Sequence, residues 1–153
     1  MTSIQSEIDI NCPVERVYEY YTNPDNIKKA WPQEYIKESE SISGSKNEEG
    51  SEMKVKGEYM GKEAEMVIEV TDKEQNKRLV TEQKTGPFKA WKSIQEFREN
   101  GSNTHVRHSI DYELPTSGKI ANFLSGDQAN NKLQDGIQQA AQTVKEKLES
   151  SSA

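Results

Sequence analysis

The chain has 153 residues, one cysteine and a formal net charge of −6 from 20 basic and 26 acidic residues. This length predicts a single domain over residues 1–149 with a disordered tail at 150–153, and a lone Cys12 excludes an intrachain disulfide. The two signs of charge are interleaved and no run of about 20 apolar residues occurs, which argues against nucleic-acid binding and membrane insertion. The opening residues lack the pattern of a signal peptide, so we expect a cytoplasmic protein.

The first part of the chain predicts a strand and two short helices. A period of two, with Ile4, Ser6, Ile8 and Ile10 on one face, indicates a strand over 4–10. Pro13 suits the first position of a helix that Asn11 or Cys12 would cap. This helix ends before Asn23-Pro24-Asp25, which starts a second short helix.

Period-two alternation then continues as far as residue 114. The expected strands are 35–42, 53–59, 64–70, 78–84, 89–98 and 104–114, with turns at 43–50, 60–62 and 72–77 among their connections. Asn100-Gly101 is a strong hairpin signal between the last two strands. After Pro115 the apolar spacing changes to 3.6 residues, which predicts a helix over about 116–149. Its apolar residues fall into two groups on different faces, so we expect a bend near Ser125-Gly126.

The order of these elements predicts an α+β fold in which an antiparallel sheet folds against a long C-terminal helix. One face of such a sheet must be covered, and the amphipathic last helix is the largest available cover. The two short helices follow the first strand, so they can close one end of the sheet's concave side.

A set of short motifs in a fixed order extends over nearly the whole chain. The motifs are Cys12-Pro13-Val14-Glu15-Arg16-Val17-Tyr18-Glu19-Tyr20, Asn23-Pro24, Trp31-Pro32, Gly50-Ser51, Gly86-Pro87-Phe88 before Trp91, Asn100-Gly101-Ser102-Asn103-Thr104, Tyr112-Glu113-Leu114-Pro115, and the terminal Ala141, Val144-Lys145 and Leu148-Glu149. Together they resemble the SRPBCC superfamily (START/Bet v 1-like), in its polyketide cyclase/dehydrase branch. The resemblance implies the helix-grip fold, in which a curved seven-stranded antiparallel sheet grips the C-terminal helix around a cavity. Members bind lipids, sterols, polyketides, plant hormones or quinones, some catalyse cyclisation or dehydration, and a similar branch activates the Hsp90 ATPase.

The expected inner face carries more polar side chains than a dry core would, because each unpaired buried polar group costs about 1–3 kcal/mol. A cavity for a small, mostly apolar ligand would tolerate them, and Tyr21 would add to its aromatic walls. The residues expected to line it are Tyr20, Trp31, Tyr35, Met53, Val55, Tyr59, Met66, Ile68, Thr81, Gln83, Trp91, Ser93, Gln95, His108, Ile110, Tyr112, Phe123, Leu124, Asn130 and Leu133. The alternative is that strands 78–84 and 89–98 present their other faces to a dry core.

His108 is the most prominent titratable residue on that face. It could act as a general base, with Tyr112 or Tyr59 as further acid or base candidates, or be a core histidine bonded to a neighbour. His105 is an odd number of residues away on the same strand, so the two histidines face opposite sides and predict no metal site. The sequence contains no nucleophile elbow and no phosphate-binding glycine loop, and we expect no cofactor.

These observations favour a binding protein over an enzyme. The expected function is binding, transport or sequestration of a small hydrophobic ligand, such as a lipid, polyketide or quinone, in an internal cavity. Two alternatives stay open: a cyclase or dehydratase acting on a polyketide-like substrate, and a partner-binding module like the Hsp90 co-chaperone branch. The expected partner is a small apolar molecule, and the sequence indicates no particular protein partner.

Overall fold

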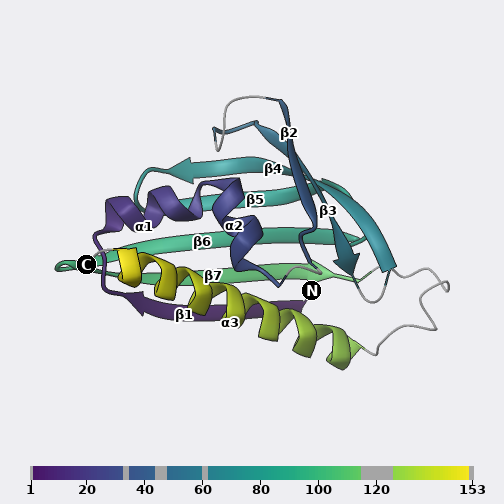
Figure 1. The fold of residues 1–153 in the computed structure, drawn as a ribbon. Helices are drawn as coiled ribbons and strands as arrows, with labels where there is room; N and C mark the ends of the chain where they lie inside the picture. The colour runs from purple at the N-terminus through teal and green to yellow at the C-terminus, as the bar shows by residue number, and fades with distance from the viewer. Residues whose placement is uncertain (1, 33–34, 44–47, 60–61, 115–125, 152–153) are drawn as a thin grey trace.

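The computed structural model describes residues 2–32, 35–43, 48–59, 62–114 and 126–151. The elements follow in the order β1 (Thr2–Ile10), α1 (Val14–Tyr21), α2 (Pro24–Ala30), β2 (Glu38–Ser43), β3 (Glu52–Tyr59), β4 (Lys62–Glu74), β5 (Arg78–Thr85), β6 (Ala90–Asn100), β7 (Asn103–Glu113) and α3 (Gly126–Ser151). All seven strands form one antiparallel sheet in the order β1-β7-β6-β5-β4-β3-β2. Helix α3 packs against β1 and extends along one edge of the curved sheet, and α1 and α2 cover the same face beside it, with α2 in contact with α3 (Figure 1). This arrangement confirms the predicted α+β helix-grip fold.

The strand that alternates most clearly in sequence does so in the structure. Side chains of β7 are buried at every second position: Thr104, Val106, His108, Ile110 and Tyr112. A two-residue loop joins β6 to β7, with Asn100 paired to Asn103 and Gly101 at φ +66°. A backbone of that sign suits glycine, which has no Cβ.

The start of α1 differs from the prediction. Pro13 lies just before the helix rather than inside it, and its carbonyl accepts hydrogen bonds from the N–H groups of Arg16 and Val17, each at 3.1 Å. Within the described residues no side chain caps this helix end, so the predicted caps Asn11 and Cys12 are wrong. An extended backbone at Pro13, with ψ 148°, leaves the proline carbonyl itself to start the helix.

Other predicted boundaries shift by a few residues. β2 begins at Glu38 rather than at 35, and β4 continues to Glu74, which shortens the turn predicted at 72–77 to 75–77. α3 continues to Ser151, where the sequence predicts a tail from residue 150. Parts of the prediction lie outside the described residues: the loop core at 44–47, the connection at 60–61, the first helical turns at 116–125 and the bend near Ser125.

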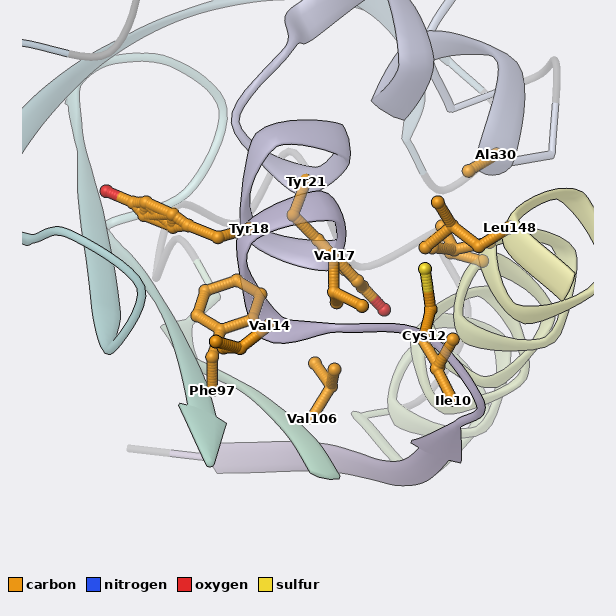
Figure 2. Packing of buried hydrophobic residues seen from close by; sticks show 12 residues of the cluster. Ile10, Cys12, Val14, Val17, Tyr18, Tyr21, Ala30, Phe97, Val106 and Leu148 are labelled. Atoms are coloured by element: carbon orange, nitrogen blue, oxygen red, sulfur yellow. The ribbon is translucent and has the colours of Figure 1, made fainter. Parts of the chain in front are cut away.

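One end of the interior is filled with side chains. Figure 2 shows this cluster, in which α1 packs between α3 and the ends of β6 and β7. Its buried residues are Ile10, Cys12, Val14, Val17, Tyr18, Tyr21, Ala30, Phe97, Val106, Ala140, Val144 and Leu148. Tyr18 and Tyr21 both contact Phe97 edge to face, with ring centroids 5.3 and 5.4 Å apart. Each such large side chain contributes about 1.5–3 kcal/mol on burial, so this cluster anchors α1 and α3 to the sheet.

Candidate functional site

The other end of the interior contains a cavity of about 140 Å³. Segments distant in sequence surround it: the end of α1, α2 and the chain after it, strands β3 to β7, and α3. The lining residues are Tyr21, Ile27, Trp31, Tyr35, Ile36, Met53, Val55, Met66, Ile68, Leu79, Thr81, Phe88, Trp91, Ser93, Gln95, His108, Ile110 and Leu133. The cavity therefore lies between the sheet and the helices, next to a second buried cluster in which Ile4, Ile110 and Tyr112 of the sheet pack against Leu133 and Ile137 of α3.

Many residues that the sequence analysis selected lie in this lining. They are Trp31, Tyr35, Met53, Val55, Met66, Ile68, Thr81, Trp91, Ser93, Gln95, His108, Ile110 and Leu133, together with the further aromatic residue Tyr21. The faces of strands 78–84 and 89–98 that the sequence predicts to point inward are thus the faces that line the cavity. Among the other predicted residues, Phe123, Leu124 and the side chain of Tyr59 lie outside the described residues.

A polar strip lies on the sheet side of the cavity. Thr81 of β5 is paired with Ser93 of β6, and Gln95 of β6 is paired with His108 of β7. Ser93 and Gln95 are two positions apart on one strand, so they share a face. The four side chains therefore form one continuous patch across three neighbouring strands.

His108 is the titratable group of this strip, and it is buried. Its Nε2 lies 2.8 Å from the Oγ of Ser93, and its ring meets Trp31 edge to face, with centroids 6.4 Å apart. Burial lowers the pKa of His108 to about 4, because the charged imidazolium would lose its hydration. His108 is consequently neutral near pH 7. It bonds a neighbour, as the core-histidine alternative predicts, and it also contacts the cavity.

Two aromatic residues of the lining are held against α3. Trp31 and Tyr35 contact each other edge to face at 5.7 Å, and the Tyr35 hydroxyl donates to the carbonyl of Lys132 at 3.0 Å. Gly136 provides the space for them, because a Cβ added there would lie 3.0 Å from the Trp31 ring and 3.1 Å from the Tyr35 ring. We call Trp31 and Tyr35 the aromatic pair. A glycine inside a helix costs about 0.5–1 kcal/mol relative to alanine, and here it lets the pair pack closely on α3.

Gln83 holds the cavity wall rather than lining the cavity. Its side-chain Nε2 donates to the carbonyl of Phe88 at 2.8 Å, and its Oε1 accepts from the N–H of Phe88 at 3.3 Å. A Cβ at Gly86 would overlap with the Gln83 carboxamide, so the absence of a side chain there permits these two hydrogen bonds, which we call the Gln83 clip. The predicted role of Gln83 as a lining residue is corrected: the amide satisfies a loop backbone, and the loop presents the Phe88 ring instead.

Tyr112 and Asn130 also satisfy each other. The Tyr112 hydroxyl donates to the Oδ1 of Asn130 at 3.0 Å, which connects β7 to α3. Tyr112 is only 1% exposed, and burial raises the pKa of its hydroxyl. Neither residue lines the cavity, so the geometry does not place Tyr112 as an acid or base toward a ligand.

Tyr20 is a further predicted lining residue that lies elsewhere. It packs, partly buried, against the α1 cluster. Tyr21 takes its place at the cavity because the buried stripe of α1 runs through Val14, Val17, Tyr18 and Tyr21, and the next side chain around the helix points about 100° away.

Sequence reasoning missed Ile27, Ile36, Leu79 and Phe88 as lining residues. A signal existed for two of them: Leu79 is two positions before Thr81 on one strand face, and Ile27 is one helical turn before Trp31. Phe88 follows a Gly-Pro break and belongs to no periodic segment, so only the Gln83 clip reveals it.

Charge is confined to other parts of the described structure. Among the described residues that line the cavity, none is Lys, Arg, Asp or Glu. One ion pair outside the cavity joins Arg78 Nε to Asp72 Oδ2 at 2.7 Å, and the hydrogen bond from Arg78 lowers the pKa of the Asp72 carboxyl. His105 also lies outside the cavity, between Asp9 and Glu7. The described residues contain no cluster that could hold a metal ion and no helix long and apolar enough to cross a membrane.

These features define a helix-grip protein with an uncharged internal cavity. Residues 1–149 match the family described as polyketide cyclase / dehydrase and lipid transport, so the chain belongs to that family. The predicted membership of the SRPBCC superfamily is thereby confirmed, and proteins of this fold generally bind hydrophobic ligands. Among curated proteins, none matches the chain.

Solved structures share the fold at low sequence identity. The protein TTHA0849 from Thermus thermophilus is 18% identical, with a TM-score of 0.82 over 99% of this chain and 100% of that chain. A START superfamily protein from Mycobacterium smegmatis is 13% identical, with a TM-score of 0.78 over 97% of each chain. Major latex-like protein 151 from Panax ginseng is 14% identical, with a TM-score of 0.72 over 96% and 97%. At these identities the likeness establishes the fold.

Proposed function

We propose that the chain binds a small hydrophobic molecule in the cavity, for sequestration or transport. One observation carries the proposal: beside the buried cluster that joins β1 and β7 to α3, the interior keeps an unfilled cavity whose lining is uncharged and largely apolar. A ligand that fills the cavity recovers contacts that the empty protein lacks.

The cavity volume bounds the occupant. Binding pockets for drug-sized molecules measure about 300–1,000 Å³, so 140 Å³ accepts one ring or a short chain. A longer lipid, polyketide or quinone would enter only if the aromatic pair or the methionines Met53 and Met66 moved aside. Methionine side chains are flexible enough to adjust to such an occupant.

Native mass spectrometry of the purified protein tests the proposal. We expect a co-purified or added apolar molecule that dissociates on activation. Ile68→Trp should fill the cavity and abolish this binding, whereas Val67→Trp makes the same kind of change on the opposite face of β4 and should leave it intact. Equal binding by both variants would place the ligand elsewhere and refute the proposal.

A catalytic function is the second candidate, and the Ser93–His108 pair at 2.8 Å is the observation that favours it. Under this alternative, His108→Ala would abolish turnover of a polyketide-like substrate, while under the binding function it changes affinity only. A base whose pKa is about 4 accepts a proton poorly near neutral pH, so the pair supports binding better than acid–base catalysis.

A partner-binding function of the co-chaperone kind has less support. Such a surface needs an apolar patch, and among the large hydrophobic side chains that the structure describes, Ile42 on β2 is the exposed one. A cytoplasmic location belongs to this proposal as well, because the buried thiol of Cys12 suits a reducing compartment.

A further inference from the structure

Resting on the proposed function, we propose that the natural occupant is an uncharged single-ring aromatic molecule with one hydroxyl group, a ligand of the phenol class, whose hydroxyl binds Ser93. Four observations of the described cavity support this assignment: its volume, its lack of charge, the hydrogen-bonding capacity of Ser93 and the aromatic rings of its walls.

The volume selects a single ring. A dry apolar cavity of about 150 Å³ in another protein takes up benzene. The present cavity, at about 140 Å³, matches that size, whereas a fused polycyclic compound exceeds it.

The lining excludes a charged ligand. None of the described residues that face the cavity carries a formal charge, and His108 stays neutral because it is fully desolvated. The same desolvation would act on a ligand carboxylate or ammonium group, and no described lining residue could pair with it. A benzoate-type anion therefore stays in water.

Ser93 selects a hydroxyl group over other polar groups. A serine offers one donor and two acceptor sites, and the bond to His108 Nε2 occupies one of these. If Nε2 lacks the proton, Ser93 donates to it and its oxygen can accept from a ligand; if Nε2 bears the proton, the Ser93 O–H is free to donate. A phenolic hydroxyl both donates and accepts, so it can bond Ser93 with either tautomer of the histidine.

The walls favour a flat ring. Five aromatic side chains contribute to the described lining: Tyr21, Trp31, Tyr35, Phe88 and Trp91. Aromatic rings in contact prefer edge-to-face or offset geometry and attract one another beyond simple burial. A saturated ring of similar size, such as cyclohexanol, lacks this attraction.

Isothermal titration calorimetry at pH 7 with phenol, toluene and benzoate tests the inference on the whole chain. Toluene replaces the hydroxyl by a methyl group of similar size. We expect phenol to bind about tenfold more tightly than toluene, the ratio that one buried hydrogen bond supplies, and benzoate not to bind. Ser93→Ala should remove the phenol preference and favour toluene, because the phenol hydroxyl would then be buried without its partner, and Ser93→Thr, which keeps the hydroxyl, should retain the preference.

Ser109→Ala is the matched control, because Ser109 follows His108 on β7 and faces the opposite side of the sheet. It should keep the phenol preference. Equal wild-type affinities for phenol and toluene, or binding of benzoate as tight as that of phenol, overturn the phenol assignment and leave the cavity as a hydrophobic site. Failure of both neutral probes to bind the wild-type protein overturns the proposed function together with the assignment.

Discussion

Acidification should destabilise this protein through one buried residue, His108. Its pKa in the folded chain is about 4, below its ordinary value of 6.5. Between these two values the unfolded chain binds a proton that the folded chain does not. The free energy of unfolding therefore rises with pH across this window and falls as the solution is acidified.

The size of this effect follows from the difference between the two pKa values. Each pH unit inside the window changes the free energy of unfolding by about 1.4 kcal/mol. Lowering the pH from 7 to 5 crosses roughly 1.5 units of the window, so His108 alone should remove about 2 kcal/mol. A domain of ordinary stability, about 5–15 kcal/mol, would lose a measurable share.

Other groups titrate nearby and must be separated from His108. Hydrogen bonds to Asp9 and Glu7 raise the pKa of His105, so the stabilisation from His105 is present at low pH and is lost as the pH rises through its folded pKa. His105 therefore opposes His108 in this range. The lowered pKa of Glu149, caused first by a bond from the backbone of Asn11, means that its stabilisation is lost only on stronger acidification.

Urea denaturation at pH 7, 6 and 5, followed by tryptophan fluorescence, measures the contribution of His108 to the free energy of unfolding. His108→Gln keeps a side chain that can bond Ser93 but does not titrate, and it should lose about 2 kcal/mol less than wild type between pH 7 and 5. His105→Gln should steepen the loss instead. The same decline in wild type and His108→Gln, within about 0.5 kcal/mol, would show that His108 is not the desolvated group described above.

Two substitutions test how the cavity walls are held. Gly136→Ala should push the aromatic pair away from α3 and weaken phenol binding at least tenfold, while the better helix propensity of alanine offsets about 1 kcal/mol of the roughly 1–3 kcal/mol that overpacking costs. Unchanged affinity would mean that the pair has room to shift. Gln83→Leu removes both bonds to the backbone of Phe88 and should lower the free energy of unfolding by about 1–3 kcal/mol in urea denaturation. Gln75→Leu, in an exposed turn, is its control, and an equal loss in both variants would count against the clip.

Local sequence patterns predicted the fold because its elements follow local rules. Alternation over 104–114 requires only that one face of a strand be buried, and Asn23-Pro24 starts α2 through a bond from the Asp25 N–H to the Asn23 side chain at 3.0 Å. Elements of this kind depend on residues a few positions apart. They predicted the strand order along the chain, the hairpin at Gly101 and the residues by which β3, β6 and β7 meet the cavity.

Tertiary structure alone decided where the interior is filled and where it is hollow. Gln83 and Asn130 have the polar character of lining residues in sequence, yet each bonds a partner that another segment supplies, Phe88 and Tyr112. Irregular register between β4 and β5, around Val67/Ile68 and Val70/Asp72, likewise has no sequence signature. Cavity volume depends on how side chains from distant segments fill shared space, and residue spacing along one strand or helix carries no information about that fit.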